Sequence, residues 1–145
     1  MNVFDFITLK HNTSYIESDS TVRQALEKMD QYKLTNLPVI DKDGKYVDSI
    51  SEGDVLRFMK NKANFNKKLT EKTYIKDVPR YRSCEPLGIR SSFTDLFNLS
   101  LEQNFIPIVD DLGTYIGIVK RKDIIKSLSK YMHDVENEEN YEVGK

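Results

Sequence analysis

The chain has 145 residues, of which 39% are hydrophobic and 31% are charged. This composition is typical of a folded globular protein and excludes an intrinsically disordered chain. The formal net charge of −1 gives no reason to expect a polyanionic partner over the whole surface. No apolar run approaches the roughly 20 residues needed to span a bilayer, so no membrane partner is expected.

The N-terminus and the cysteine content indicate a compartment. Residues 1–7 include an acid and no basic flank, which is unlike a signal peptide. Cys84 is the single cysteine, so it cannot form an internal disulfide. A reducing cytoplasm is the simplest expectation.

Two segments of the chain repeat at a constant offset of 69 residues. Residues 38–57 align with residues 107–126 without a gap, and five of the 20 pairs are identical: Pro38/Pro107, Asp41/Asp110, Gly44/Gly113, Tyr46/Tyr115 and Asp54/Asp123. Seven further pairs exchange like for like. Chance does not produce this at one fixed offset, so the chain contains one structural unit twice.

The first unit is predicted to be a helix, a β-hairpin and a second helix. Its opening helix has apolar residues at i, i+3, i+4 and i+7, namely Val22, Ala25, Leu26 and Met29. Thr21 and Gln24 are spaced to form a capping box at its start. Strands are expected at residues 37–40 and 46–50, joined by a turn that uses Gly44. An exit helix then opens near Asp54.

The segment from Asn61 to Ile75 is polar and carries four lysines against one acid. We interpret it as a solvated linker, because no aromatic or glycine-rich platform accompanies the lysines, and nucleic acid is therefore an unlikely partner. The predicted organisation is a first repeat at 1–61, a linker at 62–75, a second repeat at 76–132 and an acidic flexible tail at 133–145.

The second unit follows the same order. Phe93, Leu96, Phe97 and Leu101 mark its opening helix, residues 106–109 and 115–119 its strands, and Asp123 the start of its exit helix. One unit alone has a two-stranded ribbon and too little core to be stable. The predicted fold class is therefore α+β, with two pseudo-symmetric repeats that bury their apolar faces together.

The motif that runs from Leu37-Pro-Val-Ile-Asp41 through a glycine turn to Tyr46-Val-x-x-Ile-Ser-Glu-Gly-Asp-Val-Leu56 resembles the CBS repeat. The two copies, over about residues 10 to 132, resemble a Bateman module. The layout is also similar to stand-alone CBS-pair proteins of Gram-positive bacteria, some of which bind cyclic di-AMP. The resemblance implies a regulatory module that binds an adenine nucleotide (AMP, ADP or ATP), forms a homodimer and signals to an effector protein of unknown identity.

The resemblance also implies which residues bind the ligand. In nucleotide-binding members, an Asp at the start of the exit helix holds the ribose, and a hydroxyl three residues earlier contacts phosphate. The first site would then use Asp54 and Ser51, with the backbone around Thr35, Asn36 and Leu37 reading the base and Thr13 beneath it. The second site would use Asp123, with Phe105 and Ile106 along the base. The free N–H groups of a helix start favour phosphate nearby, although Asp54 and Asp123 could also be plain helix-terminal acids.

Two departures from the repeat pattern affect the expected sites. Lys120 stands where the family has a hydroxyl, and with Arg121 and Lys122 it forms a cationic cluster suited to more than one phosphate. Arg80 and Arg82 either point into the same cleft or are plain surface charges. Asp48 stands where the repeat usually has glycine, as at Gly117; a carboxylate facing the cleft would weaken anion binding.

No catalytic motif is found. The sequence has no phosphate-binding Gly-x-x-x-x-Gly-Lys-Ser/Thr loop, no Gly-x-Gly-x-x-Gly and no His-Glu-x-x-His. His11 and His133 flank opposite ends of the repeat pair, which does not suggest a metal site. We therefore expect no enzyme activity. Three hypotheses remain: an adenine-nucleotide sensor, a cyclic di-AMP-binding protein, and an interaction scaffold that binds no ligand.

Overall fold

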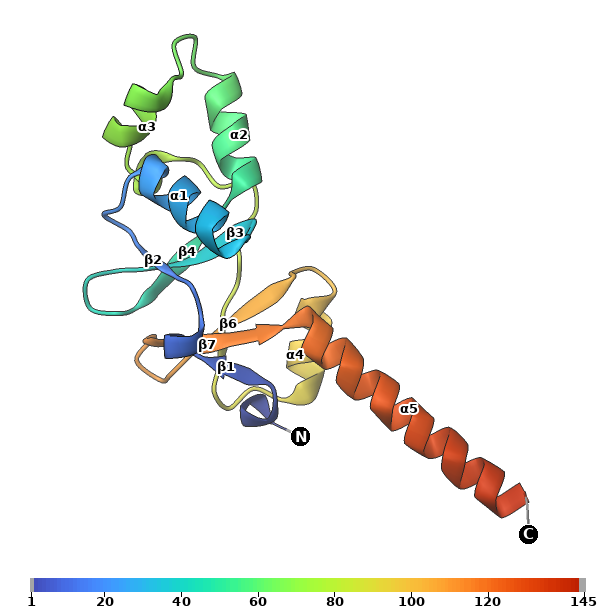
Figure 1. Ribbon diagram of the computed structural model, residues 1–145. Helices are drawn as coiled ribbons and strands as arrows, with labels where there is room; N and C mark the ends of the chain where they lie inside the picture. Colours follow the sequence, from blue (N-terminus) through green and yellow to red (C-terminus); the bar gives the residue numbers. More distant parts are fainter. Residues whose placement is uncertain (1, 144–145) are drawn as a thin grey trace.

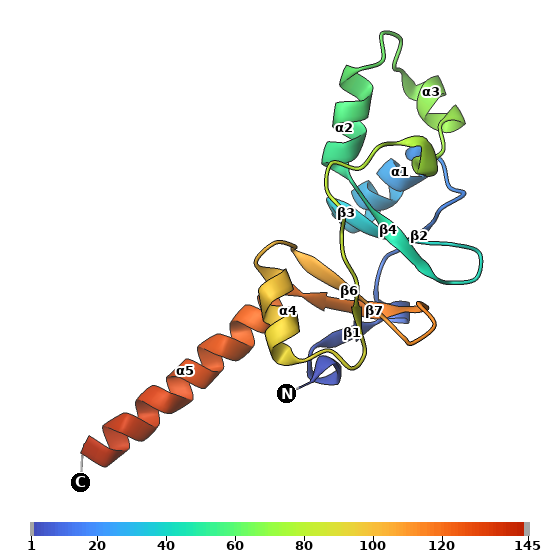
Figure 2. The same cartoon turned by 180° about the vertical axis from the view of Figure 1, so that it is seen from behind.

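The computed structural model describes residues 2–143, which form two small sheets covered by helices (Figures 1 and 2). One sheet has the order β2 (Ile16–Glu17), β3 (Asn36–Ile40), β4 (Tyr46–Ser51). The other has the order β1 (Ile7–Leu9), β7 (Tyr115–Lys120), β6 (Phe105–Val109), β5 (Leu87–Gly88). The α-helices are α1 (Val22–Tyr32), α2 (Glu52–Lys60), α3 (Lys67–Lys72), α4 (Phe93–Ser100) and α5 (Arg121–Val143). Short 3₁₀ turns lie at Val3–Asp5, Lys10–Asn12 and Ile75–Asp77.

The two hairpins repeat each other in register, which confirms the internal duplication. Leu37 pairs with Ile50 in the first hairpin and Ile106 with Val119 in the second. A bulge follows at the same place in both, between Val39 and Ile40 and between Ile108 and Val109. Both turns place a glycine at positive φ, 81° at Gly44 and 83° at Gly113, as the hairpin chemistry requires. The α+β class and the helix–hairpin–helix order are those predicted.

Each repeat has its own apolar core, so the prediction that the repeats bury their apolar faces together is wrong, and the two hairpin turns join the halves. Met29, Leu37 and Ile50 are buried in the first core, and Leu96, Ile106 and Ile124 in the second. Between the halves, the Tyr46 N–H donates to the Gly113 carbonyl at 3.1 Å, and the Tyr115 N–H donates to the Gly44 carbonyl at 2.9 Å. This reciprocal pair places the repeats about a pseudo-twofold axis.

The chain crosses between the halves at both ends of the first repeat. β1 pairs antiparallel with β7, and Val3 is fully buried in the second core. In the other direction, Ile75 and Val78 pack into the first core. The structure thus assigns residues 2–9 to the second half and residues 75–78 to the first, unlike the boundaries expected from the repeat alone.

Two segments expected to be irregular contain helix. The linker forms α3, capped by the Asn66 side chain, which accepts from the Leu69 N–H at 3.0 Å. The predicted flexible tail continues α5 to Val143, and Figure 1 shows this helix projecting from the body. The packed first turns of α5 supply the nucleus, and glutamates that favour helix extend it. Within residues 2–143, no helix has the length and apolar character needed to cross a membrane.

Candidate functional site

A cleft of about 880 Å³ lies between the two halves. Its walls come from β4, the start of α2, the connecting segment 81–85, the end of α4 with the loop that follows, β6 and the first residue of α5. Six of the residues predicted to bind ligand line it: Asn36, Ser51, Asp54, Arg82, Phe105 and Arg121. Residues far apart in sequence are therefore gathered around one cavity large enough for a nucleotide.

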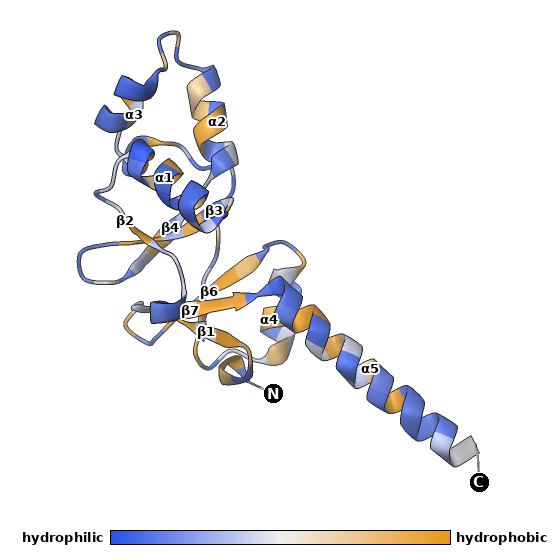
Figure 3. Cartoon of the chain, in the orientation of Figure 1, coloured by the Kyte–Doolittle hydropathy of each residue, from blue (hydrophilic) through white to orange (hydrophobic). Residues whose placement is uncertain are grey.

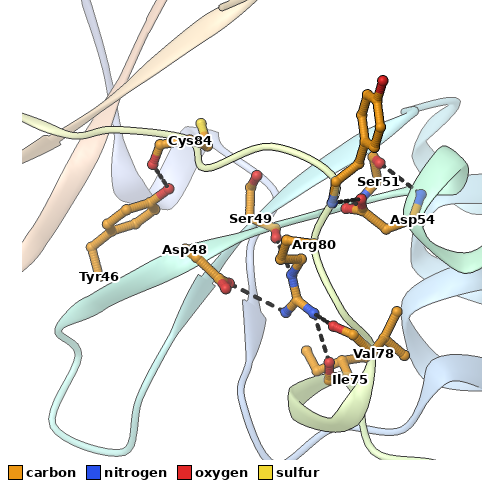
Figure 4. A network of polar contacts seen from close by, with 10 residues as sticks. Tyr46, Asp48, Ser49, Ser51, Asp54, Ile75, Val78, Arg80 and Cys84 are labelled. Atoms are coloured by element: carbon orange, nitrogen blue, oxygen red, sulfur yellow. Dashed lines mark hydrogen bonds and ion pairs between the residues drawn. The ribbon is translucent and has the colours of Figure 1, made fainter.

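Asp54 is buried at the start of α2 and has hydrogen-bond partners on both carboxylate oxygens (Figure 4). Its Oδ2 accepts from the Ser51 N–H at 2.9 Å, and the Ser51 Oγ accepts from the Asp54 N–H at 3.0 Å, which is a capping box. Its Oδ1 accepts from the Tyr81 N–H at 2.9 Å and from the Arg57 guanidinium at 3.4 Å. Asp54 thus caps α2 and also ties the segment that connects the repeats to that helix.

Three guanidinium groups line the cleft, those of Arg57, Arg82 and Arg121, together with two aromatic residues, Tyr81 and Phe105. The Arg57 guanidinium lies 4.1 Å from the centroid of the Tyr81 ring, and that of Arg82 lies 5.6 Å from it. Arg121 donates from Nε to the Ser100 carbonyl at 2.7 Å, which holds its side chain against the end of α4. These cations can pair with phosphate oxygens in a partly desolvated site.

The sequence reasoning missed Arg57 and Tyr81. Arg57 follows Asp54 by three residues, so helical spacing places both on one face of α2, and this signal was available. The place of Tyr81 depends on the path of the connecting segment, which no local pattern reveals.

Asn36 lines the cleft and has a buried side-chain oxygen without a hydrogen-bond partner. Its Oδ1 is the one buried side-chain oxygen or nitrogen in the described part of the chain that has no hydrogen bond. Such groups are rare in folded proteins because an unpaired buried acceptor costs about 1–3 kcal/mol. Asn36 begins β3 at the wall of the cleft, so a bound molecule or an ordered water could satisfy this atom.

Arg80 does not line the cleft, so the alternative in which it points into the cleft is not the one that the structure shows. Its guanidinium donates to the carbonyl oxygens of Ser49, Ile75 and Val78 and lies 3.2 Å from an Asp48 carboxylate oxygen (Figure 4). Its side chain is 14% exposed and lines a hollow of about 390 Å³ beside α2, which adjoins the cleft and shares Asp54, Arg57 and Tyr81 with it.

Asp48 therefore has a structural partner and does not line the cleft. Burial raises the pKa of the Asp48 carboxyl, and the Arg80 cation opposes that rise. The concern that this carboxylate would repel an anionic ligand in the cleft does not apply to this geometry.

The remaining predicted site residues are dispersed. Thr13 does not lie beneath the Asp54 cleft: its Oγ1 is hydrogen bonded to the Tyr115 hydroxyl at 2.8 Å and lines a different hollow of about 430 Å³. Asp123 lines a third hollow, of about 660 Å³, with residues 5–8. Leu37 and Ile106 are fully buried in the two cores, so only their backbone could contact a ligand.

Thr35 and the lysines of the cationic cluster do not line the large cleft either. The Thr35 carbonyl accepts from the Glu52 N–H at 3.0 Å, which holds the strand entry to the start of α2. Lys120 is half-buried at the end of β7, and Lys122 is exposed on α5. Of the three predicted cations at residues 120–122, Arg121 alone faces the cleft.

The described residues contain no group of three or more His, Cys, Asp or Glu side chains that could hold a metal ion. His133 is hydrogen bonded to Asn137 at 3.2 Å. Burial raises the pKa of the Cys84 thiol, which disfavours the reactive thiolate form.

Comparison with known proteins identifies the class. The model of the CBS domain matches residues 5–61 and 87–130, which is more than half of the chain. The protein therefore belongs to the CBS-domain family, with two CBS repeats in tandem.

Its curated relatives include two chloroplastic CBS domain-containing proteins of Arabidopsis thaliana. CBSX2 is 32% identical over 93% of this chain and 66% of its own length, and CBSX1 is 27% identical over 86% of this chain and 63% of its own. The chain thus spans about two thirds of the relatives it matches. It also matches 22% of the length of the inosine-5'-monophosphate dehydrogenase of Aquifex aeolicus, at 28% identity over 79% of this chain.

Solved structures share the fold over nearly the whole chain. CBSX2 in complex with AMP superposes with a TM-score of 0.72 at 28% identity and covers 90% of this chain and 98% of that structure. CbpB in complex with c-di-AMP gives a TM-score of 0.82 at 20% identity, over 95% and 91%. The second likeness speaks for the fold alone.

Proposed function

We propose that this chain is a regulatory module that binds an adenine nucleotide in the cleft between its repeats and catalyses no reaction. The observation that carries the proposal is the cleft itself, where Ser51, Asp54 and three arginines meet an unsatisfied Asn36. The related CBSX2 has been solved with AMP, which supports a nucleotide as the ligand class.

Each wall of the cleft suits one part of a nucleotide. The Asp54 carboxylate can accept hydrogen bonds from the two ribose hydroxyls, and Arg57, Arg82 and Arg121 can pair with phosphates. Asn36 and Phe105 are left for the base, one through its amide and the other through its ring. Ser51 stands at the N-terminal end of α2, where free N–H groups favour an anion.

Binding at Asp54 would be coupled to the connecting segment. Oδ1 already accepts from the Tyr81 N–H and from Arg57, so a ribose hydroxyl must share or replace these partners. The segment that bears Tyr81 links the two repeats, and its position would differ between the free and bound states. A ligand shifts such an equilibrium by its difference in affinity for the two states. An effector protein that binds one state more tightly would then bind more or less strongly when the ligand is present.

Cyclic di-AMP is the second candidate ligand. It carries two phosphates, for which three guanidinium groups are sufficient partners, and the similarly folded CbpB has been solved with this molecule. A scaffold that binds no ligand remains the rival of both. We further propose a homodimer, and the cytoplasm stays the predicted compartment.

The test is a melting scan of protein stripped of nucleotide, followed by calorimetric titration of every ligand that shifts it. A ligand at a hundredfold excess over Kd stabilises the folded state by about 2.7 kcal/mol. For a domain of this size each kcal/mol moves the melting point by about 2–4 °C, so a true ligand should raise it by roughly 5–11 °C. The panel is adenosine, AMP, ADP, ATP, cyclic di-AMP and the guanine counterparts. Flat melting points at millimolar ligand would favour the scaffold.

A further inference from the structure

The far end of the first half, formed by the end of α2, the loop after it and α3, is strongly cationic (Figure 1). Residues 57–72 contain six Lys and Arg side chains against one acid, Glu71, and that acid is paired with Arg23. Five exposed lysines, which we call the lysine patch, form no ion pair with a residue of the described range 2–143: Lys60, Lys62, Lys67, Lys68 and Lys72. Because the whole chain has a net charge of −1, this is a local excess of positive charge.

The hollow of about 390 Å³ beside α2 opens at the edge of the lysine patch, because Lys62 belongs to both. Its wall also carries three ring side chains, those of Phe58, Pro79 and Tyr81. Figure 3 shows hydrophobic residues along the middle of α2 and a mostly hydrophilic α3. The hollow is at the lower end of the size range of ligand sites, roughly 300–1,000 Å³, so it suits one large apolar side chain.

Local contacts hold the wall of this hollow in place. The Phe58 ring meets the Phe65 ring edge to face, with centroids 6.0 Å apart. The Lys62 ammonium lies 5.1 Å from the Phe58 ring, and the Asn61 side-chain amide donates to the Arg57 carbonyl at 3.1 Å. The cations are thus held beside the apolar wall, and a partner that binds there has less conformational entropy to remove.

Cations beside an apolar hollow favour an acidic protein segment over a nucleic acid. Proteins bind single strands by stacking bases on aromatic rings. The guanidinium groups of Arg57 and Arg82 already lie over the Tyr81 ring, 4.1 and 5.6 Å from its centroid, so a base would have to displace them. An acidic segment with one large apolar side chain fills the hollow and pairs with the lysines at once, like an interface anchor with a charged rim.

We propose that the hollow and the lysine patch together form a docking surface for an effector protein. The effector supplies an acidic segment that carries one large apolar side chain. That side chain enters the hollow between Phe58 and Tyr81, and the carboxylates on either side of it pair with Lys62 and the other lysines of the patch.

The docking surface is joined to the nucleotide cleft through shared residues. Arg57 and Tyr81 line both the hollow and the cleft, and both donate to the Asp54 carboxylate. A nucleotide that takes over these hydrogen bonds moves the wall of the hollow and changes the affinity for the effector, and the effector changes the affinity for the nucleotide by the same factor. This coupling rests on the proposed nucleotide function, whereas the docking itself does not.

The experiment titrates the nucleotide-free full chain with three synthetic peptides and follows its backbone amides by NMR. The peptides are Glu-Glu-Phe-Glu-Glu, the same peptide with Gly in place of Phe, and Lys-Lys-Phe-Lys-Lys. The first should shift the amide signals of residues 57–62 and 80–82 and bind about tenfold or more tightly than the other two, since only it offers both the anchor and the charge.

A pair of variants tests the lysines. Lys60→Glu with Lys62→Glu should weaken binding of the first peptide about tenfold or more. Lys42→Glu with Lys45→Glu, two exposed lysines of the first hairpin turn, is the matched control and should bind like the parent. Circular dichroism verifies that both variants are folded.

The docking surface is refuted if no peptide shifts residues 57–62 at millimolar concentration, or if the Gly peptide binds as tightly as the Phe peptide. Shifts centred on residues 99–105 would place the peptide in the cleft instead. A single-stranded RNA oligonucleotide that binds the patch more tightly than the first peptide would assign it to nucleic acid.

The coupling is measured by repeating the first titration with saturating AMP or cyclic di-AMP. The peptide affinity should change about fivefold or more, the lower end of typical coupling between sites. An unchanged affinity with a nucleotide bound overturns the coupling and leaves the docking surface intact. If neither nucleotide shifts the signals of the cleft, the nucleotide function and the coupling both fail, and the peptide titration alone decides the docking surface.

Discussion

The Arg80 guanidinium lies 3.2 Å from a carboxylate oxygen of Asp48, at the β4 position that corresponds to Gly117 on β7. In the second repeat, β1 occupies the space beside the glycine, and a Cβ on Gly117 would stand 2.2 Å from the Thr8 carbonyl oxygen. In the first repeat, β4 is an edge strand, and Arg80 from the connecting segment covers it. The same repeat position thus receives a strand in one half and an ion pair in the other.

We expect Arg80→Met to lower the free energy of unfolding by about 2–4 kcal/mol. The change leaves three carbonyl oxygens and a partly buried carboxylate without their donor. Urea titration gives the value, with Arg82→Met as the exposed control, for which a change below about 0.5 kcal/mol is expected. Adding Asp48→Asn to Arg80→Met should recover part of the loss, because it removes the uncompensated charge. Equal losses at Arg80 and Arg82 would refute the anchoring role.

Gly117→Ala should destabilise the second half by about 1–3 kcal/mol, the range for overpacking in a close-packed interior. The new methyl group would collide with the backbone of β1 at Thr8, so the N-terminal strand should detach first. Hydrogen exchange at residues 7–9 is the sensitive measurement. Gly88→Ala is the matched control, since a Cβ there meets no atom within 4 Å. Unchanged protection of residues 7–9 in Gly117→Ala would contradict the close approach.

The repeat architecture could be predicted because its signals are local. Helical periodicity and the glycine turns lie within short windows, and the duplication is found by comparing two such windows, residues 38–57 and 107–126. The exchange of β1 into the second sheet could not be predicted, because a three-residue strand carries no periodicity and its partner lies more than a hundred residues away. α3 could not be predicted either, because its six residues contain one large apolar side chain, Leu69, and so show no helical periodicity.

Part of the candidate site could be predicted from the sequence and part could not. Ser51 and Asp54 follow from the motif at the start of the exit helix, and the structure brings both to the cleft. Arg80 and Tyr81 are adjacent in sequence, yet one anchors β4 and the other faces the cleft. The path of the connecting segment decides between these roles, and that path depends on tertiary contacts with β4 and α2.

In Tyr115→Phe, the free energy of unfolding should fall less steeply as the pH rises above 10 than it does in the parent. Burial raises the pKa of the Tyr115 hydroxyl from 10.0 to about 12, partly opposed by its hydrogen bond with Thr13. Because the folded pKa is the higher one, the stabilisation by this group is fully present below pH 10 and is lost as the pH rises toward 12. At neutral pH the variant should lose about 0.5–1.5 kcal/mol with the hydrogen bond. Urea titrations at pH 8 and 10.5 give the slope. The same slope in parent and variant would exclude Tyr115 as a source of the alkaline loss.

Asp54→Ala should weaken nucleotide binding in the cleft by about 1.5–3 kcal/mol, the scale of hydrogen bonds to a charged group. It should also cost stability, because the α2 capping box and the Tyr81 contact are lost. Asp123→Ala separates the two effects, since Asp123 lines a different hollow and its loss should leave the affinity of the cleft unchanged. Calorimetry below the melting point of both variants is the measurement. An unchanged affinity in Asp54→Ala would remove Asp54 from the ribose role.

Arg121→Ala and Lys122→Ala should separate the cleft from the cationic surface beside it. Arg121 lines the cleft, whereas Lys122 is exposed on α5 and does not. Arg121→Ala should therefore lower the affinity for ADP and ATP about tenfold or more, the equivalent of one charged hydrogen bond, and change that for adenosine little. Lys122→Ala should alter none of the three. Exposed charges are screened over about 8 Å at physiological salt. The contribution of Arg121, which lines the cleft, to the parent's preference for polyphosphates should therefore persist at high salt. Arg121 also donates to the Ser100 carbonyl, so a loss that is equal for adenosine and ATP would mean that the cleft had collapsed and would refute the phosphate role.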